Sequence, residues 1–63
     1  MKLTLKDIAM FYCCSLRTAQ IRKEEIRLGL SLTKRHVSIY DLSCYEGLTV
    51  SEVKKAIGLR YNH

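Results

Sequence analysis

Three side chains in one stretch of the chain, Arg17, Gln20 and Ile21, are of types that can contact the edges of DNA bases. An arginine can read guanine or hold a phosphate, a glutamine can pair with adenine, and an isoleucine can contact a thymine methyl group. At about 100° per residue, these three residues lie on the same side of a helix. Lys23 and Arg27 lie nearer the edges of this side, where cations suit phosphate groups. The spacing therefore indicates a helix surface suited to a nucleic acid, with discrimination expected from Arg17 and Gln20.

The helix that would carry these residues has apolar side chains on both sides. The inward side is formed by Ala19, Ile26 and Leu30, with Leu16 flanking it. Ile21 and Leu28 form a second apolar stripe on the outward side, and an exposed stripe of this kind usually marks a partner surface. We expect the second half of the same chain to pack on this stripe, because so small a chain needs every apolar contact. The alternative is a homodimer, which would pair two half-sites on DNA.

The composition indicates one small helical domain. The chain has 63 residues, 48% of them hydrophobic, with no proline and only three glycines, so long irregular loops are not expected. Its net charge of +5 suits a polyanion such as DNA, RNA or an acidic membrane surface. No apolar run approaches the roughly 20 residues of a membrane span, and the polar N-terminal stretch predicts no signal peptide. We therefore expect a cytoplasmic protein without a membrane partner.

The cysteines and histidines do not form a recognisable site. Cys13, Cys14 and Cys44 are an odd number without the spacing of a disulfide framework, which indicates free thiols in a reducing compartment. Together with His36 and His63 they lack the C-x-x-C spacing of a zinc site. No glycine-rich phosphate loop is present, and a cysteine–histidine pair would need a pocket that so small a chain rarely forms. We predict no metal, no cofactor, no small-molecule substrate and no enzymatic activity. Cys13 and Cys14 are expected as small turn and core residues, and Cys44 as an exposed thiol.

Four helices are predicted from capping residues at their starts and glycines at their ends. The expected N-caps are Thr4 with Asp7, Ser15, Ser38 with Asp41, and Thr49 with Glu52. Gly29 is expected as a left-handed C-cap of the second helix, and Gly47 and Gly58 as the ends of the third and fourth. The predicted boundaries are a helix pair over 4–29, a basic linker over 30–37, a second helix pair over 38–58 and a frayed tail over 59–63.

The two helix pairs form a repeat. Sliding the sequence by 34 positions, the gap between Asp7 and Asp41, aligns caps with caps and core positions with core positions without a gap. Thr4 then falls on Ser38, Ile8 on Leu42, Ser15 on Thr49 and Ala19 on Val53. Because few residues are identical, the similarity is one of physical role, from ancestry or from convergence on one motif. Each half predicts a short helix, a tight turn and a second helix.

Each half resembles the helix-turn-helix superfamily. The residues that carry the resemblance are Asp7-Ile8-Ala9 and Ser15-Leu16-Arg17-Thr18-Ala19 in the first half, and Asp41-Leu42-Ser43, the turn glycine Gly47, the apolar plug Leu48 and Thr49 through Val53 in the second. The resemblance covers about 4–27 and 38–58, and small excisionase-like proteins and phage or plasmid regulators are the most similar members. It implies that the first helix braces the DNA backbone while the second helix lies in the major groove.

Two residues of the first half depart from the pattern of this superfamily. Cys13 stands where glycine is usual, so we expect a less regular turn there. Arg22 stands where an apolar core residue is usual, whereas the second half has Ala56 at that place. The second half is therefore the cleaner motif, but the first half has the better base-reading side chains. We expect the first half to read DNA and the second half to serve as a scaffold or to contact a neighbouring stretch of groove.

The sequence thus predicts a single all-α domain of four short helices that form two tandem helix-turn-helix units. The expected function is non-enzymatic, sequence-selective binding of double-stranded DNA, and the resemblance implies a transcriptional regulator or a recombination accessory factor. The expected DNA contacts are Ser15, Arg17, Thr18, Gln20, Ile21, Lys23, Arg27, Lys34, Arg35, Lys54 and Lys55. Residues such as Lys34 and Arg35 are more often solvated linker positions than DNA contacts. The alternatives are RNA binding and a small protein-interaction module, an adaptor or anti-repressor, that uses the Ile21/Leu28 stripe.

Overall fold

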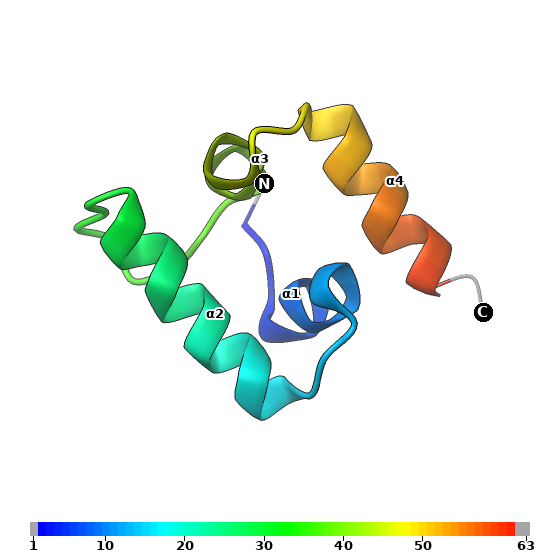
Figure 1. Cartoon of the computed structure of the whole chain (residues 1–63), viewed down its shortest axis with the longest axis horizontal. Helices are drawn as coiled ribbons and strands as arrows, with labels where there is room; N and C mark the ends of the chain where they lie inside the picture. The colour runs from blue at the N-terminus through cyan, green and yellow to red at the C-terminus, as the bar shows by residue number, and fades with distance from the viewer. Residues whose placement is uncertain (1, 62–63) are drawn as a thin grey trace.

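The computed structural model describes residues 2–61, with side chains described as far as residue 58. It contains four α-helices, α1 (Leu5–Tyr12), α2 (Leu16–Gly29), α3 (Ile39–Glu46) and α4 (Val50–Tyr61). The short helices α1 and α3 lie in the middle, and the longer helices α2 and α4 flank them on opposite sides (Figure 1). Over the described residues there is no strand, only an isolated antiparallel bridge between Lys2 and Ser38. The prediction of an all-α chain with four helices is confirmed.

The predicted N-caps form at the helix starts. Thr4 and Asp7 make a capping box, in which the Asp7 N–H donates to the Thr4 hydroxyl over 3.1 Å and the Thr4 N–H donates to the Asp7 carboxylate over 2.9 Å. The same two reciprocal bonds join Ser38 with Asp41 and Thr49 with Glu52. Each such cap satisfies backbone N–H groups that the helix leaves open, and it contributes about 1 kcal/mol.

The turns within the two helix pairs have the same backbone geometry. Cys13 is in the left-handed conformation with φ 55° and ψ 50°, and Gly47 is in the same region with φ 70° and ψ 30°. The N–H of the residue after each of them donates back into the first helix, over 3.0 Å to the Ala9 carbonyl and over 2.9 Å to the Ser43 carbonyl. The prediction of a less regular turn at Cys13 is therefore wrong, because the cysteine adopts the conformation that glycine usually takes.

The core lies where the four helices meet. Its buried apolar side chains are Leu3, Ile8, Ala9, Ala19, Ile26, Val37, Ile39, Leu42, Val53 and Ile57. Ala19 and Ile26, predicted on the inward side of α2, have no exposed surface. Leu48, predicted as an apolar plug, remains 37% exposed, so it does not fill that role. Burial follows the repeat, since Ile8 and its equivalent Leu42 are both fully buried.

Two contacts join residues to their own repeat equivalents. The Leu3 N–H donates to the Val37 carbonyl over 2.9 Å. The Tyr12 hydroxyl donates to the Glu46 carboxylate over 2.6 Å, and these residues are also 34 positions apart. Contacts between equivalent residues are expected beside a two-fold axis that relates the two halves of a molecule. The opposite directions of α2 and α4 in Figure 1 agree with such an approximate two-fold arrangement.

The end of α2 differs from the prediction. Gly29 is the last residue of the helix and Leu30 is its C-cap with φ −98°, while Ser31 takes the left-handed conformation with φ 54°. Gly29 is therefore not a left-handed C-cap. A Cβ atom at this position would lie 2.7 Å from Cε1 of Tyr45, so the missing side chain allows the α3 ring to pack closely on α2.

The end of α4 also differs from the prediction. Gly58 lies inside this helix, which continues to Tyr61. The frayed tail predicted over 59–63 is thus wrong for its first three residues, and its last two lie outside the described part of the chain. An interior glycine weakens a helix by only about 1 kcal/mol relative to alanine, so it is a poor stop signal by itself.

Candidate nucleic-acid interface

The start of α2 is fixed by Ser15 and Thr18. The Ser15 hydroxyl accepts the Thr18 N–H over 3.2 Å and also bonds the Thr18 hydroxyl over 3.2 Å. These bonds cap the first turn, whose remaining N–H groups point away from the helix with a partial positive charge. Ser15 and Thr18 therefore act first as the residues that set the start and direction of α2.

The outward side of α2 brings Arg17, Gln20 and Ile21 together. All three are exposed, Ile21 to 57%, and they lie opposite the fully buried Ala19 and Ile26. Within the described part of the chain, no hydrogen bond or ion pair engages the side chain of Arg17 or Gln20. We call these three residues the α2 outward face. The arrangement matches the helical spacing predicted from the sequence.

The arginines and glutamates farther along α2 form ion pairs with each other. The Arg27 guanidinium bonds the Glu24 carboxylate at 2.8 and 3.1 Å, and its Nε atom donates to the Lys34 carbonyl over 2.9 Å. A phosphate contact by Arg27 would require these bonds to break. Arg22 pairs with Glu25 over 3.1 Å. Both acidic residues of this stretch are thus neutralised by neighbouring arginines, whereas Lys23, which is half-buried, makes no ion pair in the described structure.

The position of Arg22, where the sequence resemblance leads us to expect an apolar core residue, is accommodated by Tyr12 of α1. The guanidinium carbon of Arg22 lies 5.6 Å from the centre of the Tyr12 ring, so the charge stacks on an aromatic face at the surface. Burial and the hydrogen bond to the Glu46 carboxylate raise the pKa of the Tyr12 hydroxyl above its ordinary value. This hydroxyl therefore remains protonated and joins α1 to α3.

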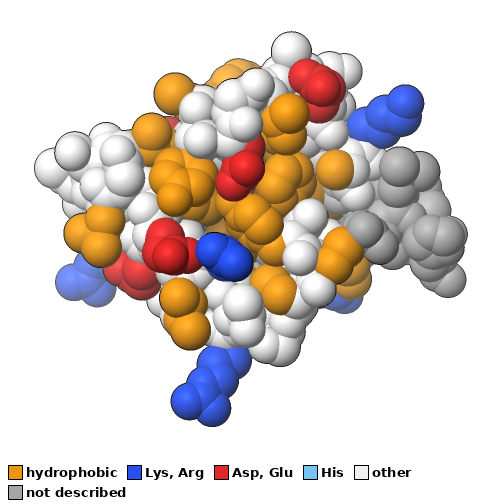
Figure 2. Space-filling model, in the orientation of Figure 1, with side chains coloured by type: hydrophobic (Ala, Val, Ile, Leu, Met, Phe, Trp, Pro, Cys, Tyr) orange, Lys and Arg blue, Asp and Glu red, His pale blue; other side chains and the backbone are white. Residues whose placement is uncertain are grey.

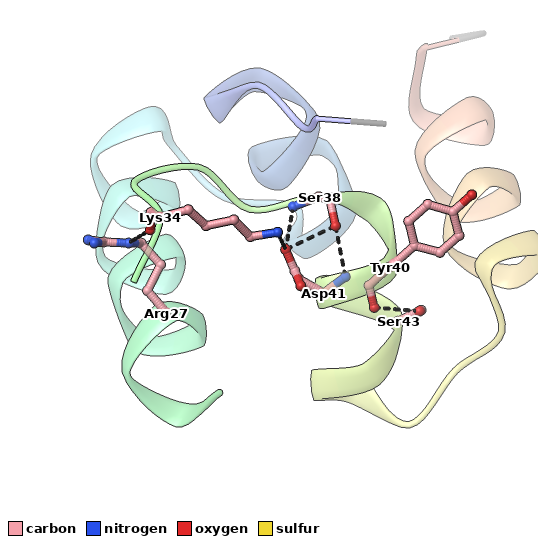
Figure 3. Close-up of polar contacts among 6 residues, drawn as sticks. All are labelled: Arg27, Lys34, Ser38, Tyr40, Asp41 and Ser43. Atoms are coloured by element: carbon pink, nitrogen blue, oxygen red, sulfur yellow. Dashed lines mark hydrogen bonds and ion pairs between the residues drawn. The ribbon is translucent and has the colours of Figure 1, made fainter. Parts of the chain in front are cut away.

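The basic linker is tied to α3 and is not a free arm. The Lys34 ammonium group lies 2.7 Å from the Asp41 carboxylate, and Figure 3 shows Lys34 reaching from the linker to the start of α3. Desolvation raises the pKa of Asp41, but the Lys34 ammonium and hydrogen bonds from Ser38 outweigh it and leave the pKa lowered. Arg35 is exposed. Lys34 and Arg35 follow the C-terminal end of α2, whereas Arg17 lies in its first turn.

The predicted contacts on α4 lie on a different flank of the molecule. Lys54 and Lys55 are exposed and have no ion pair in the described structure. Helix α4 packs against α1 and α3 and does not pack on α2. Figure 2 shows hydrophobic side chains near the centre of one face and Lys and Arg side chains projecting from separate edges. The structure therefore does not gather all the predicted residues into one site.

The apolar stripe of α2 remains uncovered. Ile21 is 57% exposed and Leu28 is 79% exposed. The prediction that the second half packs on this stripe is wrong, because α4 packs on the other side of α1 and only α3 reaches the end of α2. Leu16, predicted to flank the core, is also 58% exposed.

An open, mostly apolar cleft of about 480 Å³ lies beside the start of α2. It is lined by Lys6, Ala9, Met10, Cys13, Cys14, Ser15 and Leu16. Its walls come from one side of α1, from the turn after it and from the first residue of α2, and sequence reasoning did not find it. Of the three thiols, Cys13 and Cys44 are exposed and Cys14 is half-buried.

The described residues contain no group of three His, Cys, Asp or Glu side chains arranged to hold a metal ion. None of the described helices has the length and apolar character needed to cross a membrane. Comparisons of the chain with protein-family models, curated proteins and solved structures found no match.

Proposed function

We propose that this chain binds double-stranded DNA without catalysing a reaction, and that its two helix pairs are tandem helix-turn-helix units. The observation that carries the proposal is the α2 outward face, on which Arg17, Gln20 and Ile21 are exposed and the two polar side chains are without protein partners. The helix bearing them is held by α1 across a left-handed turn. In this motif the second helix enters the major groove.

The charges around α2 favour a polyanion over other partners. The net charge is +5, and the acidic side chains of α2 are paired with arginines, so no unpaired carboxylate on α2 repels phosphate. Arg17 at the first turn and Lys23 along the helix supply phosphate contacts or, for Arg17, a guanine contact. Gln20 supplies an adenine contact and Ile21 a thymine methyl contact. The biological role that fits this chemistry is a transcriptional regulator or a recombination accessory factor.

A binding titration tests this function. Labelled random duplex is titrated with the protein at two salt concentrations, and a preferred site is then selected from a random pool. We expect affinity to fall steeply with salt, because phosphate contacts release counterions. Arg17→Ala should weaken the preferred site by roughly 10-fold or more and random duplex much less, since a base contact is worth about 1–3 kcal/mol. Lys2→Gln, which removes an exposed charge outside α2, is the control. Equal loss on both duplexes would make Arg17 only a phosphate contact.

The second candidate function is a protein-interaction module, and the exposure of Ile21 and Leu28 favours it. Their exposed fractions of 57% and 79% leave an apolar stripe that a partner protein would cover. The same titration separates the two functions, since an adaptor shows little duplex binding even at low salt. Competition between duplex DNA and duplex RNA in that assay identifies an RNA-binding protein.

A further inference from the structure

The two longer helices turn their exposed sides away from each other. Helices α2 and α4 lie on opposite flanks, with α1 and α3 between them (Figure 1), and they share no contact. Their buried residues, Ala19 and Ile26 on α2 and Val53 and Ile57 on α4, all belong to the central core. A straight duplex lying along the outward side of α2 therefore does not reach the outward side of α4.

The outward side of α4 has the chemistry of a phosphate-binding surface. Ser51, Lys54 and Lys55 are exposed at the repeat equivalents of Arg17, Gln20 and Ile21. The carboxylate of Glu52 bends back to the Thr49 N–H over 3.0 Å, and the two lysines have no ion pair in the described structure. The described side chains of α4 include no large exposed apolar group, in contrast to α2. This surface suits the sugar–phosphate backbone better than it suits a protein.

The size of the molecule excludes one way of using both helices on a single duplex. Recognition helices that enter successive major grooves on one face of DNA lie about 34–36 Å apart, centre to centre. The Cα atoms of this chain extend 34 × 25 × 17 Å in total. The centres of α2 and α4 must be closer together than the longest of these dimensions, so the two helices cannot lie in successive grooves.

We propose that one copy of the chain bridges two DNA duplexes, with α2 in the major groove of one and Lys54 and Lys55 of α4 on the backbone of the other. This inference rests on the proposed function. It assigns the second half of the chain a DNA partner of its own. The protein would then hold two stretches of DNA side by side, one against each helix pair.

A capture experiment tests the bridge. One duplex is fixed to beads and loaded with protein, and the recruitment of a second, fluorescent duplex is measured. The Lys54→Gln/Lys55→Gln variant is compared with Lys54→Arg/Lys55→Arg, which retains both charges. Losing two phosphate contacts near 0.1 M salt should reduce recruitment by roughly 10- to 100-fold, while affinity for the fixed duplex changes by less than about threefold. The arginine variant should recruit as the unaltered protein does.

The composition of the complex is measured by sedimentation, with one protein and two duplexes expected. Three results overturn the bridge while leaving DNA binding intact. They are a complex with one duplex only, a complex that holds two protein copies, and an equal loss of first-duplex affinity in the glutamine variant. If the unaltered protein binds no duplex at all, the proposed function fails and the bridge fails with it.

Discussion

Replacing Cys13 by glycine is expected to stabilise the protein, although it removes a side chain. Cys13 is held at φ 55°, where an L-residue carries about 1–2 kcal/mol of strain that glycine does not. Glycine has more conformational freedom in the unfolded chain, which offsets roughly 0.5–1 kcal/mol of this gain. Because Cys13 is exposed, little packing is lost. We expect a net gain of about 0.5–1 kcal/mol, which raises the melting temperature by roughly 2–8 °C in a domain of this size.

The reciprocal change tests the same turn in the second half. A Cβ atom at Gly47 meets no heavy atom within 4 Å, so Gly47→Ala carries only the conformational cost of φ 70°. We expect it to destabilise by about 0.5–1 kcal/mol. Cys13→Ala, which removes the thiol but keeps an L-residue, should leave stability nearly unchanged. Denaturant and thermal unfolding followed by circular dichroism measure all three. Loss of stability in Cys13→Gly, or no loss in Gly47→Ala, would refute the assignment of these turns.

Two further substitutions test polar contacts of α3, with the linker and with α1. Asp41→Asn should cost roughly 1–2 kcal/mol at neutral pH, since it weakens the cap on Ser38 and removes the ion pair with Lys34. Because the folded pKa of Asp41 is lowered, its stabilisation is fully present above the ordinary pKa of about 3.9 and is lost as pH falls through the lower folded value. The difference in unfolding free energy between the unaltered protein and Asp41→Asn, measured in urea, should therefore disappear in acid. A difference that stays constant with pH would show that the ionised carboxylate is not its source. Tyr12→Phe should cost about 1 kcal/mol by loss of the bond to Glu46; an unchanged urea midpoint would show that this bond adds nothing.

The helix starts and the turn at Gly47 could be predicted from the sequence because each depends on residues a few positions apart. The capping box of Thr4 needs only Asp7, three residues on, and the turn at Gly47 needs only a residue that accepts a positive φ. The outward placement of Arg17 and Gln20 follows from the helical period alone. The repeat of 34 positions extended these local signals to the second half.

Two errors are local, the turn at Cys13 and the end of α4 at Gly58, because a cysteine can take a positive φ and one interior glycine costs a helix little. The other errors concern contacts between segments distant in the sequence. Which element covers Ile21 and Leu28 depends on how the helix pairs pack, and α4 lies elsewhere. Gly29 has the place of a helix terminator in the sequence, but in the structure its missing side chain leaves room for the Tyr45 ring of α3. Arg27 has the spacing of a phosphate contact, yet the path of the linker brings the Lys34 carbonyl to it. A helical pattern predicts the side on which a residue lies, but it does not predict the partner that side meets.

The most direct test of DNA binding through α2 is an NMR titration of isotope-labelled protein with a short duplex. The account predicts that backbone amide signals of residues 15–21 shift most and that the buried amides of Ile8 and Leu42 hardly move. Shifts confined to other surfaces, such as the middle of α1 and α3, with the 15–21 signals unchanged, would contradict it. So would the absence of any shift at low salt.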